Sequence, residues 1–460
     1  MRKRALCFVL ACSTAICIAQ NESRFHSDLR REGEALKQCG AISRVEDCGQ
    51  TVFLGQPLHI AVGSLAPDNG VAVGLALVEH KNFANEWRTS FNVDAGATMN
   101  NSWRAGGYMK AFKLSGGNTY HVAPLFYLYS QSISLNRVDY FGLGQNTTPL
   151  NHTTFGFTEN ITGVNAAIPI SVHGQAPIFA IVAEINGRFP SVRRGVEKNI
   201  PSIDSLFTES TAPGLNHQTA FVQPSEGLRL FPALFKDGIR LNYLLQFQQF
   251  FGPGDSVYSF RRFNADFDHE IPLSVLSKKY YNAGRAAVFP HNGPDDCTST
   301  GGENKAMPCP QVSLTRKLEG SIHLRVFLSE SFAGKGSSVP FYFSPTIGGS
   351  DLDGTHMLGS YPDYRFRGPD LLLFRGSVEH SLGKLPIGAL FSVDEAKVGL
   401  RRGDISLDHF RHSFGAGLTV HAGGLPMISF LYTRGGNEGT HAIANISPAL
   451  LGSSGRPPLF

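Results

Sequence analysis

The stretch Arg262-Phe263-Asn264-Ala265-Asp266-Phe267-Asp268-His269-Glu270-Ile271 decides the fold class. Its even-numbered positions are all charged or amide side chains, whereas its odd-numbered positions are apolar or aromatic except for His269. Because successive side chains of a β-strand point to opposite faces of a sheet, this alternation predicts a strand with one apolar and one ionic face. A run of about ten alternating residues is also the usual length of a strand that crosses a membrane.

Other segments repeat the pattern with polar or glycine-rich breaks between them. The clearest are 240–248, 322–329 and 372–379, and further candidate strands lie near 71–80, 86–98, 102–114, 119–132, 153–170, 177–189, 219–231, 385–400, 411–422, 425–434 and 440–451. Several ionic faces on successive strands need a common aqueous interior or a large solvated sheet. We therefore predict an all-β protein, a transmembrane antiparallel β-barrel of roughly 14–16 strands. A secreted β-sandwich is the alternative, because its strands alternate as well.

Composition supports strands and argues against several functional classes. The chain has 50 Gly and 34 Phe but only 17% charged residues, which suits short strands joined by turns and fits a helical enzyme poorly. The net charge of +4 is small for this length, and no basic cluster interleaved with aromatic residues is present. Nucleic-acid binding is therefore not predicted.

The two ends of the chain are predicted to lie outside the barrel. Arg2, Lys3 and Arg4 precede an apolar run from Ala5 to Ala19, which predicts a signal peptide over residues 1–19. A lipoprotein anchored at Cys12 is the alternative. We assign residues 20–70 to a cap, plug or tether, 71–451 to the barrel and 452–460 to a C-terminal tail.

Four cysteines remain once the signal peptide is removed: Cys39, Cys48, Cys297 and Cys309. Two local disulfides, Cys39 to Cys48 and Cys297 to Cys309, are the simple interpretation for an exported chain. Metal ligation is the alternative, but neither a CxxC motif nor paired histidines accompany these residues, so no metal site and no cofactor are predicted. The second pair lies in the polar stretch 274–311, which we expect to form an external loop, and 194–214 is expected to form another long loop.

Five stretches near the C-terminus occur in an order that carries a resemblance. They are 341–350 (Phe-Tyr-Phe-Ser-Pro-Thr-Ile-Gly-Gly-Ser), 361–368 (Tyr-Pro-Asp-Tyr-Arg-Phe-Arg-Gly), 377–379, 391–394 and 413–418. Together they resemble the C-terminal barrel of the bacterial surface antigens of the BamA and TamA type, and 140–144 resembles a tyrosine and glycine motif near the start of such barrels. The resemblance implies a bacterial outer-membrane location and a link to protein insertion or translocation. The family's periplasmic POTRA repeats have no counterpart in this sequence, so a stand-alone barrel is expected.

The resemblance also implies a site inside the barrel. In that family a long loop folds into the lumen, and an Arg-Gly pair on it meets acids of the inner wall. Glu379 and Asp394 match the wall acids, although each could equally be a solvated carboxylate of the lumen. Where the family has its arginine, this sequence has Leu358-Gly359-Ser360-Tyr361, and the Arg-Gly pair Arg367 and Gly368 comes later. The contact is then made by Arg365 or Arg367, or it is lost.

No catalytic constellation accompanies these features. A Gly-x-Ser-x-Gly motif is absent, and the acids of 266–270 alternate with apolar residues as ordinary lumen groups do, so we predict a protein that is not an enzyme. The function implied is that of a barrel related to insertion and translocation barrels. Outer-membrane lipid surrounds it, and other outer-membrane or periplasmic proteins are candidate partners. A passive channel or transporter for small solutes is the alternative.

Overall fold

The computed structural model describes residues 24–37, 52, 57–83, 87–113, 126–170, 178–234, 238–278, 285–290, 313–317, 319–349, 357–383, 385–422, 425–436 and 438–447. The predicted signal peptide, Cys39, Cys48, Cys297, Cys309 and the tail 452–460 lie outside the described residues. The two disulfides therefore remain predictions. Ahead of the barrel, residues Arg24–Lys37 form helix α1. None of the described helices combines the length and the apolarity that crossing a membrane requires.

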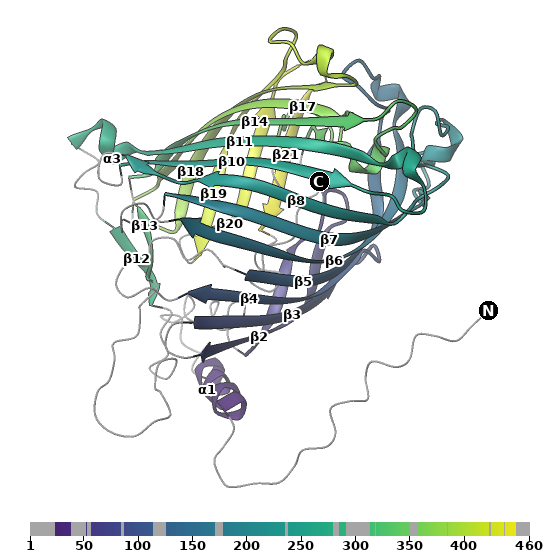
Figure 1. Cartoon of the computed structure of the whole chain (residues 1–460). Coiled ribbons are helices and arrows are strands. Elements are labelled where there is room, and N and C mark those ends of the chain that lie inside the picture. Colours follow the sequence, from purple (N-terminus) through teal and green to yellow (C-terminus); the bar gives the residue numbers. More distant parts are fainter. Residues whose placement is uncertain are drawn as a thin grey trace, which may run out of the picture.

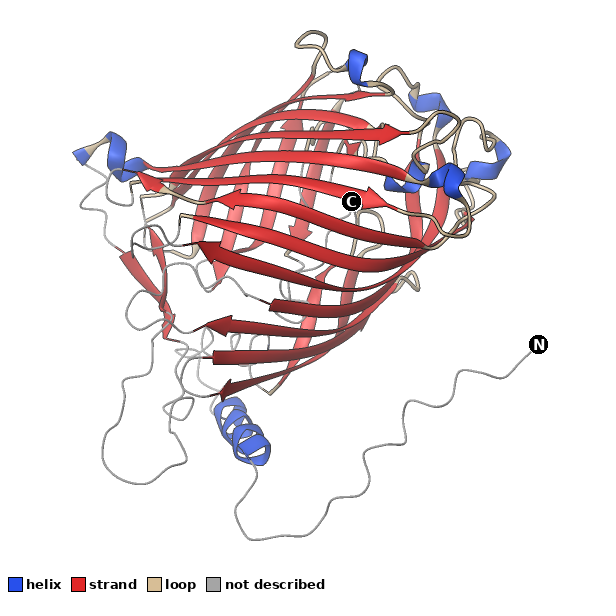
Figure 2. Ribbon diagram, in the orientation of Figure 1, coloured by secondary structure: helices blue, strands red, loops and turns tan. Residues whose placement is uncertain are grey.

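One antiparallel sheet curls into a barrel (Figure 1, Figure 2). Its strands are β1 (Leu58–Ser64), β2 (Val71–Phe83), β3 (Trp87–Ala97), β4 (Trp103–Lys113), β5 (Phe126–Tyr140), β6 (Thr153–Ile170), β7 (Phe179–Arg194), β8 (Phe221–Leu230), β9 (Ala233–Leu234), β10 (Ile239–Phe250), β11 (Phe260–Pro272), β14 (Ser321–Ala333), β17 (Asp370–Ser381), β18 (Ile387–Gly399), β19 (Arg411–Ala422), β20 (Leu425–Arg434) and β21 (Thr440–Ile446). The sheet has 17 strands, but β8 and β9 both pair with β10 and act as one interrupted strand, so 16 strands wall the barrel. The predicted all-β antiparallel barrel is confirmed, at the upper end of the expected strand number.

The barrel begins earlier than the sequence indicated. We assigned residues 20–70 to a cap, plug or tether, but β1 pairs with β2 from Leu58 to Ser64. The inward positions of β1 are His59, Ala61 and Gly63 rather than charged side chains. The alternation in β1 is therefore too weak to mark a strand.

The two faces of the wall differ as the alternation predicted. On β11, Arg262 is buried inside the barrel, and Asp266 forms an ion pair with Arg325 of β14 on the same face. The outer face carries large apolar side chains that are exposed on many strands, among them Val73, Leu75, Val93, Ile181, Ile185, Leu324, Phe391 and Phe430. An apolar outside and a polar inside are the arrangement of a barrel that stands in lipid.

The connections at the two ends of the barrel differ in kind. An even number of antiparallel strands brings the start of β1 and the end of β21 to one end, here called the terminus end. Helix α3 (Leu273–Leu276) and the hairpin of β12 (Arg285–Pro290) and β13 (Ser313–Lys317) follow β11 at this same end. The stretch 274–311, which we expected as an external loop, thus leaves the barrel at the terminus end.

The opposite end, here called the loop end, carries most of the short helical turns (Figure 2). They are η3 (Pro149–Asn151), η4 (Ile203–Ser205), η5 (Ser256–Tyr258), η6 (Phe341–Phe343) and η7 (Arg402–Asp404). The predicted long loop 194–214 is among these connections. The connection between β14 and β17, residues 334–369, turns back into the barrel from this end and is called the inward segment.

Candidate functional site: the inward segment and the seam

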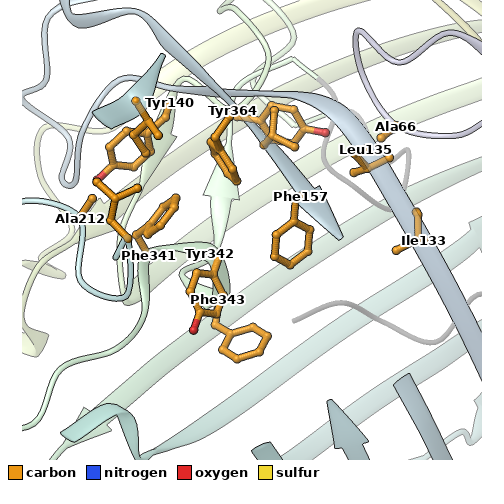
Figure 3. Close-up of a cluster of buried hydrophobic side chains, with 14 of the residues drawn as sticks. Ala66, Ile133, Leu135, Tyr140, Phe157, Ala212, Phe341, Tyr342, Phe343 and Tyr364 are labelled. Carbon is orange, nitrogen blue, oxygen red and sulfur yellow. The ribbon is translucent and has the colours of Figure 1, made fainter. Parts of the chain in front are cut away.

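A buried, largely aromatic cluster, here called the plug, packs between the inward segment and the barrel wall (Figure 3). Phe341, Tyr342 and Phe343 of the inward segment are each at most 2% exposed. Wall aromatics surround them: the ring centroid of Phe341 lies 5.2 Å from that of Tyr140, and that of Phe343 lies 5.1 Å from that of Phe221. A barrel of this size is too wide to be filled by wall side chains alone. The inward segment therefore supplies the core that the wall cannot.

Buried arginines satisfy the backbone of this aromatic turn. Arg262 donates from Nη2 to the carbonyl of Phe343 at 2.6 Å, and Arg367 donates from Nη1 to the carbonyl of Phe341 at 3.0 Å. Arg188 lies over the ring of Phe343 at 4.8 Å and binds Glu159 at 2.8 and 3.1 Å. Carbonyls in a dry interior must find donors, and the long arginine side chains reach them from the wall and from the segment itself.

The tip of the inward segment is fastened to the wall mainly by backbone groups. The N–H of Leu358 donates to Asp394 Oδ2 at 3.0 Å, and the N–H of Ser360 donates to Ser413 Oγ at 3.0 Å. The carbonyl of Gly359 accepts from Thr433 Oγ1 at 2.6 Å. The tip thus contacts β18, β19 and β20 in turn. A Cβ on Gly359 would lie 2.8 Å from Thr433 Cγ2, so this close approach requires glycine.

Asp394, one of the two predicted wall acids, does meet the inward segment, but through the backbone of Leu358. Its guanidinium partner is Arg375 of the neighbouring strand β17, which donates from Nε at 2.6 Å and from Nη2 at 2.9 Å. The wall therefore provides the arginine that the tip sequence Leu358-Gly359-Ser360-Tyr361 lacks. A bidentate pair of this kind holds the carboxylate in one orientation, which leaves Oδ2 aimed at the tip.

Arg365 of the inward segment donates four hydrogen bonds, and neither of its partners was predicted. Its Nε and Nη2 donate to Glu438 at 2.6 and 2.9 Å, and Nη1 and Nη2 donate to the side chain and carbonyl of Thr147 at 2.6 and 2.7 Å. The guanidinium is 1% exposed and also stacks on Phe141 and Phe366. We call Arg365, Glu438 and Thr147 the Arg365 clamp. The prediction that the loop arginine meets Glu379 or Asp394 is corrected to Glu438.

The other predicted site residues have separate roles. Arg367 pairs with Thr346 in a two-stranded ribbon of β15 (Thr346–Ile347) and β16 (Phe366–Arg367). Burial lowers the pKa of the Arg367 guanidinium to about 10, which leaves it cationic at neutral pH. A Cβ on Gly368 would lie 2.6 Å from the carbonyl oxygen of Gly399, so glycine at this position lets the backbone of the inward segment pass close to the end of β18 just before β17 begins. Glu379 accepts from Thr419 Oγ1 at 2.8 Å and lies 2.8 Å from His421 Nε2, a contact between wall strands.

Sequence reasoning missed Glu438, Thr147 and Arg375. Glu438 and Thr147 lie in short connections at the loop end, and no periodic pattern marks such positions. Arg375 carried a signal, because the alternation of β17 puts it on the polar face, and it opposes Asp394 in the register with β18.

The first and last strands meet along a seam. Each other pair of neighbouring strands in the barrel is joined by a ladder of backbone pairs, whereas no such ladder joins β1 to β21 in the described part of the chain. Strand β21 lies beside the end of β1 and the β1–β2 turn: the N–H of Ile446, the last residue of β21, donates to Oγ of Ser64, the last residue of β1, at 3.1 Å. A cavity of about 280 Å³ opens here between the β1–β2 turn, the inward segment at Gly359, Tyr361 and Asp363, and β21.

The Arg365 clamp connects the two sides of this seam. Glu438 belongs to the turn between β20 and β21, on one side. Thr147 belongs to the connection between β5 and β6, on the other side. On that second side, Asn69 of the β1–β2 turn donates to the carbonyl of Arg137 at 2.6 Å, and Arg137 pairs with Asp68 at 3.2 Å. The loop end is thus tied across the seam through one guanidinium.

Comparison with known proteins finds similar structures but no matching sequences. No protein-family model matches the sequence, and no curated protein matches it either. Among solved structures, CdiB from Acinetobacter baumannii is similar (12% identity, TM-score 0.44, 85% of this chain and 60% of that chain). CdiB from Escherichia coli is similar too (11% identity, TM-score 0.45, 85% and 62%), as is BamA from Haemophilus ducreyi lacking POTRA domains 1-3 (10% identity, TM-score 0.44, 84% and 69%).

The chain therefore spans less than two thirds of the length of each CdiB chain. At these identities the likeness describes the barrel fold and carries no statement about activity.

Proposed function

We propose that the chain is an outer-membrane β-barrel of the surface-antigen type, and that its seam between β1 and β21 acts in protein insertion or translocation. The observation that carries the proposal is that, among the described residues, β1 and β21 are the one pair of neighbouring barrel strands without a ladder of backbone pairs. The inward segment is fastened to β19 and β20, the strands next to β21, and we infer that it helps to hold the junction closed.

The physical reason lies in the backbone of the edge strands. In the hydrocarbon of a membrane, each unpaired N–H or C=O costs several kcal/mol. Two edge strands without a mutual ladder must therefore pair with each other or with an added strand. Strand addition to an exposed edge is a general way to bind an extended segment, because backbone groups supply the affinity. A protein segment that enters the membrane as a β-strand carries unpaired backbone N–H and C=O groups, and these can pair with the N–H and C=O groups of this edge.

The membrane location is supported by the outer face. Large apolar side chains stand exposed around the wall; Val73, Leu75 and Val93 are each 58% exposed. A water-soluble protein rarely presents so extended an apolar surface, whereas a barrel in lipid requires one. The ionic side chains of the same strands point into the barrel, as the pair of Asp266 and Arg325 shows.

A disulfide across the seam tests the proposal. Ser64 Oγ lies 3.1 Å from the backbone nitrogen of Ile446, so these two residues are neighbours across the seam and are the positions chosen for a cysteine crosslink. The Ser64→Cys/Ile446→Cys barrel, reconstituted in vesicles, should accelerate the folding of an added unfolded barrel protein only after reduction. The readout is the heat-dependent gel shift of that added protein.

The matched control links a laddered junction instead. Leu75 of β2 and Ala95 of β3 oppose each other in register, so Leu75→Cys/Ala95→Cys adds a disulfide where no opening is proposed. This control should be equally active when oxidised and when reduced. Full activity of the oxidised seam variant would show that the seam is not the working element, and an unaltered barrel without any activity would contradict the proposed function as a whole.

The second candidate function, a passive channel, is favoured by the ionic inner wall. The plug opposes it, because Phe341, Tyr342 and Phe343 place buried aromatic rings inside the barrel (Figure 3). Ions crossing an apolar constriction lose their hydration at a large cost in free energy. We therefore expect planar-bilayer recordings of the unaltered barrel to show no steady open conductance. A steady conductance at low voltage would replace the insertion proposal with the channel.

A further inference from the structure

A second candidate site lies on the outer face, away from the inward segment and the seam. A groove of about 590 Å³ crosses five strands, β14, β17, β18, β19 and β20. Its walls are two rows of outward side chains that the strand register aligns. One row is Leu324, Gly376, Val393, Phe414 and Arg434, and the other is Ile322, Val378, Phe391, Ala416 and Tyr432.

Two small residues hollow the groove out. Gly376 and Ala416 each stand in a row of large side chains, of which Phe391, Phe414 and Tyr432 are 60%, 55% and 59% exposed. The backbone does not require the glycine: a Cβ on Gly376 would find Leu324 Cδ2 as its nearest atom, at the ordinary contact distance of 3.7 Å. The backbone therefore accepts a side chain at this position, so the hollow is a feature of the side chains and not a necessity of the fold.

The end of the groove is charged. Arg434 is the last residue of β20, at the loop end, and its side chain is exposed. It enters no ion pair with any described residue. Tyr432 lies two residues before it on the same face, and tyrosine and arginine side chains favour the boundary between hydrocarbon and water. The groove therefore runs along the outer face from an apolar end at Ile322 and Leu324 to a cationic end at Arg434.

We propose that this groove binds one membrane lipid with a net negative headgroup. Its acyl chain lies between the two apolar rows, and its headgroup pairs with Arg434. A preformed groove lowers the conformational entropy that an acyl chain loses on binding, and a single exposed guanidinium favours an anionic headgroup over a zwitterionic one. The inference rests on the proposed membrane location, because only a barrel in lipid exposes this face to acyl chains.

The test uses the detergent-purified full chain, stripped of lipid and supplied with phosphatidylglycerol or phosphatidylcholine. Native mass spectrometry counts the lipids that stay bound. We expect the unaltered barrel to keep one phosphatidylglycerol in preference to phosphatidylcholine. Gly376→Leu fills the groove and should lower the retention of both lipids by about tenfold, as expected when roughly one buried apolar side chain's worth of contact is lost. Arg434→Gln should remove the preference for phosphatidylglycerol while retention of phosphatidylcholine stays unchanged.

The control places the same new side chain elsewhere on the outer face. Ala95 of β3 is exposed beside Leu75, so Ala95→Leu enlarges the apolar surface far from the groove and should leave lipid retention unchanged. The lipid site is overturned if Gly376→Leu keeps phosphatidylglycerol as the unaltered barrel does, or if Arg434→Gln keeps the headgroup preference. Failure of the membrane location itself is recognised separately: the protein would then fractionate as a soluble protein and show no heat-dependent gel shift.

Discussion

Replacing Glu438 by glutamine is expected to lower the free energy of unfolding by about 3–5 kcal/mol, the usual cost of breaking a buried ion pair. Arg365 is 1% exposed, and Glu438 is the acid that neutralises it, at 2.6 and 2.9 Å. Glutamine keeps the size of the side chain but leaves the guanidinium without a negative partner in a dry site. The measurement is urea unfolding in detergent micelles, followed by the loss of the heat-dependent gel shift.

Two variants separate the ion pair from nonspecific damage. Arg365→Met together with Glu438→Gln removes the stranded charge and is expected to recover part of the lost stability. Asp204→Asn breaks the exposed pair with Arg194, whose side chain is 81% exposed, and should cost less than about 1 kcal/mol. If Glu438→Gln unfolds at the same urea concentration as the unaltered barrel, the clamp does not stabilise the loop end.

The clamp also bears on the seam. Because it ties the β20–β21 turn to the β5–β6 connection through the inward segment, its loss frees the two sides of the seam to separate at the loop end. The expected stability change and the proposed opening of the seam thus depend on the same three residues. For this reason, replacing Glu438, which lies in a turn, is expected to lower the free energy of unfolding about as much as replacing a core residue.

Replacing Phe343 by alanine is expected to have an effect of similar size, about 3–5 kcal/mol, because it empties the centre of the plug. The Phe343 ring contacts those of Phe221 at 5.1 Å and Phe250 at 5.4 Å, and Arg188 stacks on it at 4.8 Å. Alanine removes all of these contacts while the wall keeps the surrounding groups apart, so the cavity cannot collapse. Urea unfolding, followed by tryptophan fluorescence, measures the loss.

The control for the plug is a phenylalanine on the outer face. Phe189 on β7 is 54% exposed and faces lipid or detergent, so Phe189→Ala exchanges one apolar surrounding for another and should change stability far less. Equal losses for Phe343→Ala and Phe189→Ala would mean that the plug is not the core of the barrel. The comparison thus measures how much the inward segment contributes beyond the wall.

The sequence alone predicted the barrel, its approximate strand number and the direction in which each face points. Alternation along a strand is a local property: Arg262 to Ile271 shows it without knowledge of any neighbour, and β11 has the ionic face inside as expected. The same reasoning failed at β1, whose inward positions are His59, Ala61 and Gly63. The inward fold of 334–369 followed from the resemblance of its motifs, and the structure places that segment in the barrel.

Only the tertiary structure decided which groups meet. Arg365 lies 73 residues from Glu438 and 218 from Thr147 along the chain, and no periodicity relates positions so far apart. Asp394 finds its guanidinium on the adjacent strand because the register of β17 and β18 sets Arg375 opposite it. The seam, too, depends on where the sheet closes on itself. Sequence patterns determine the face that a strand buries, whereas curvature, register and closure of the whole sheet determine the partners it finds there.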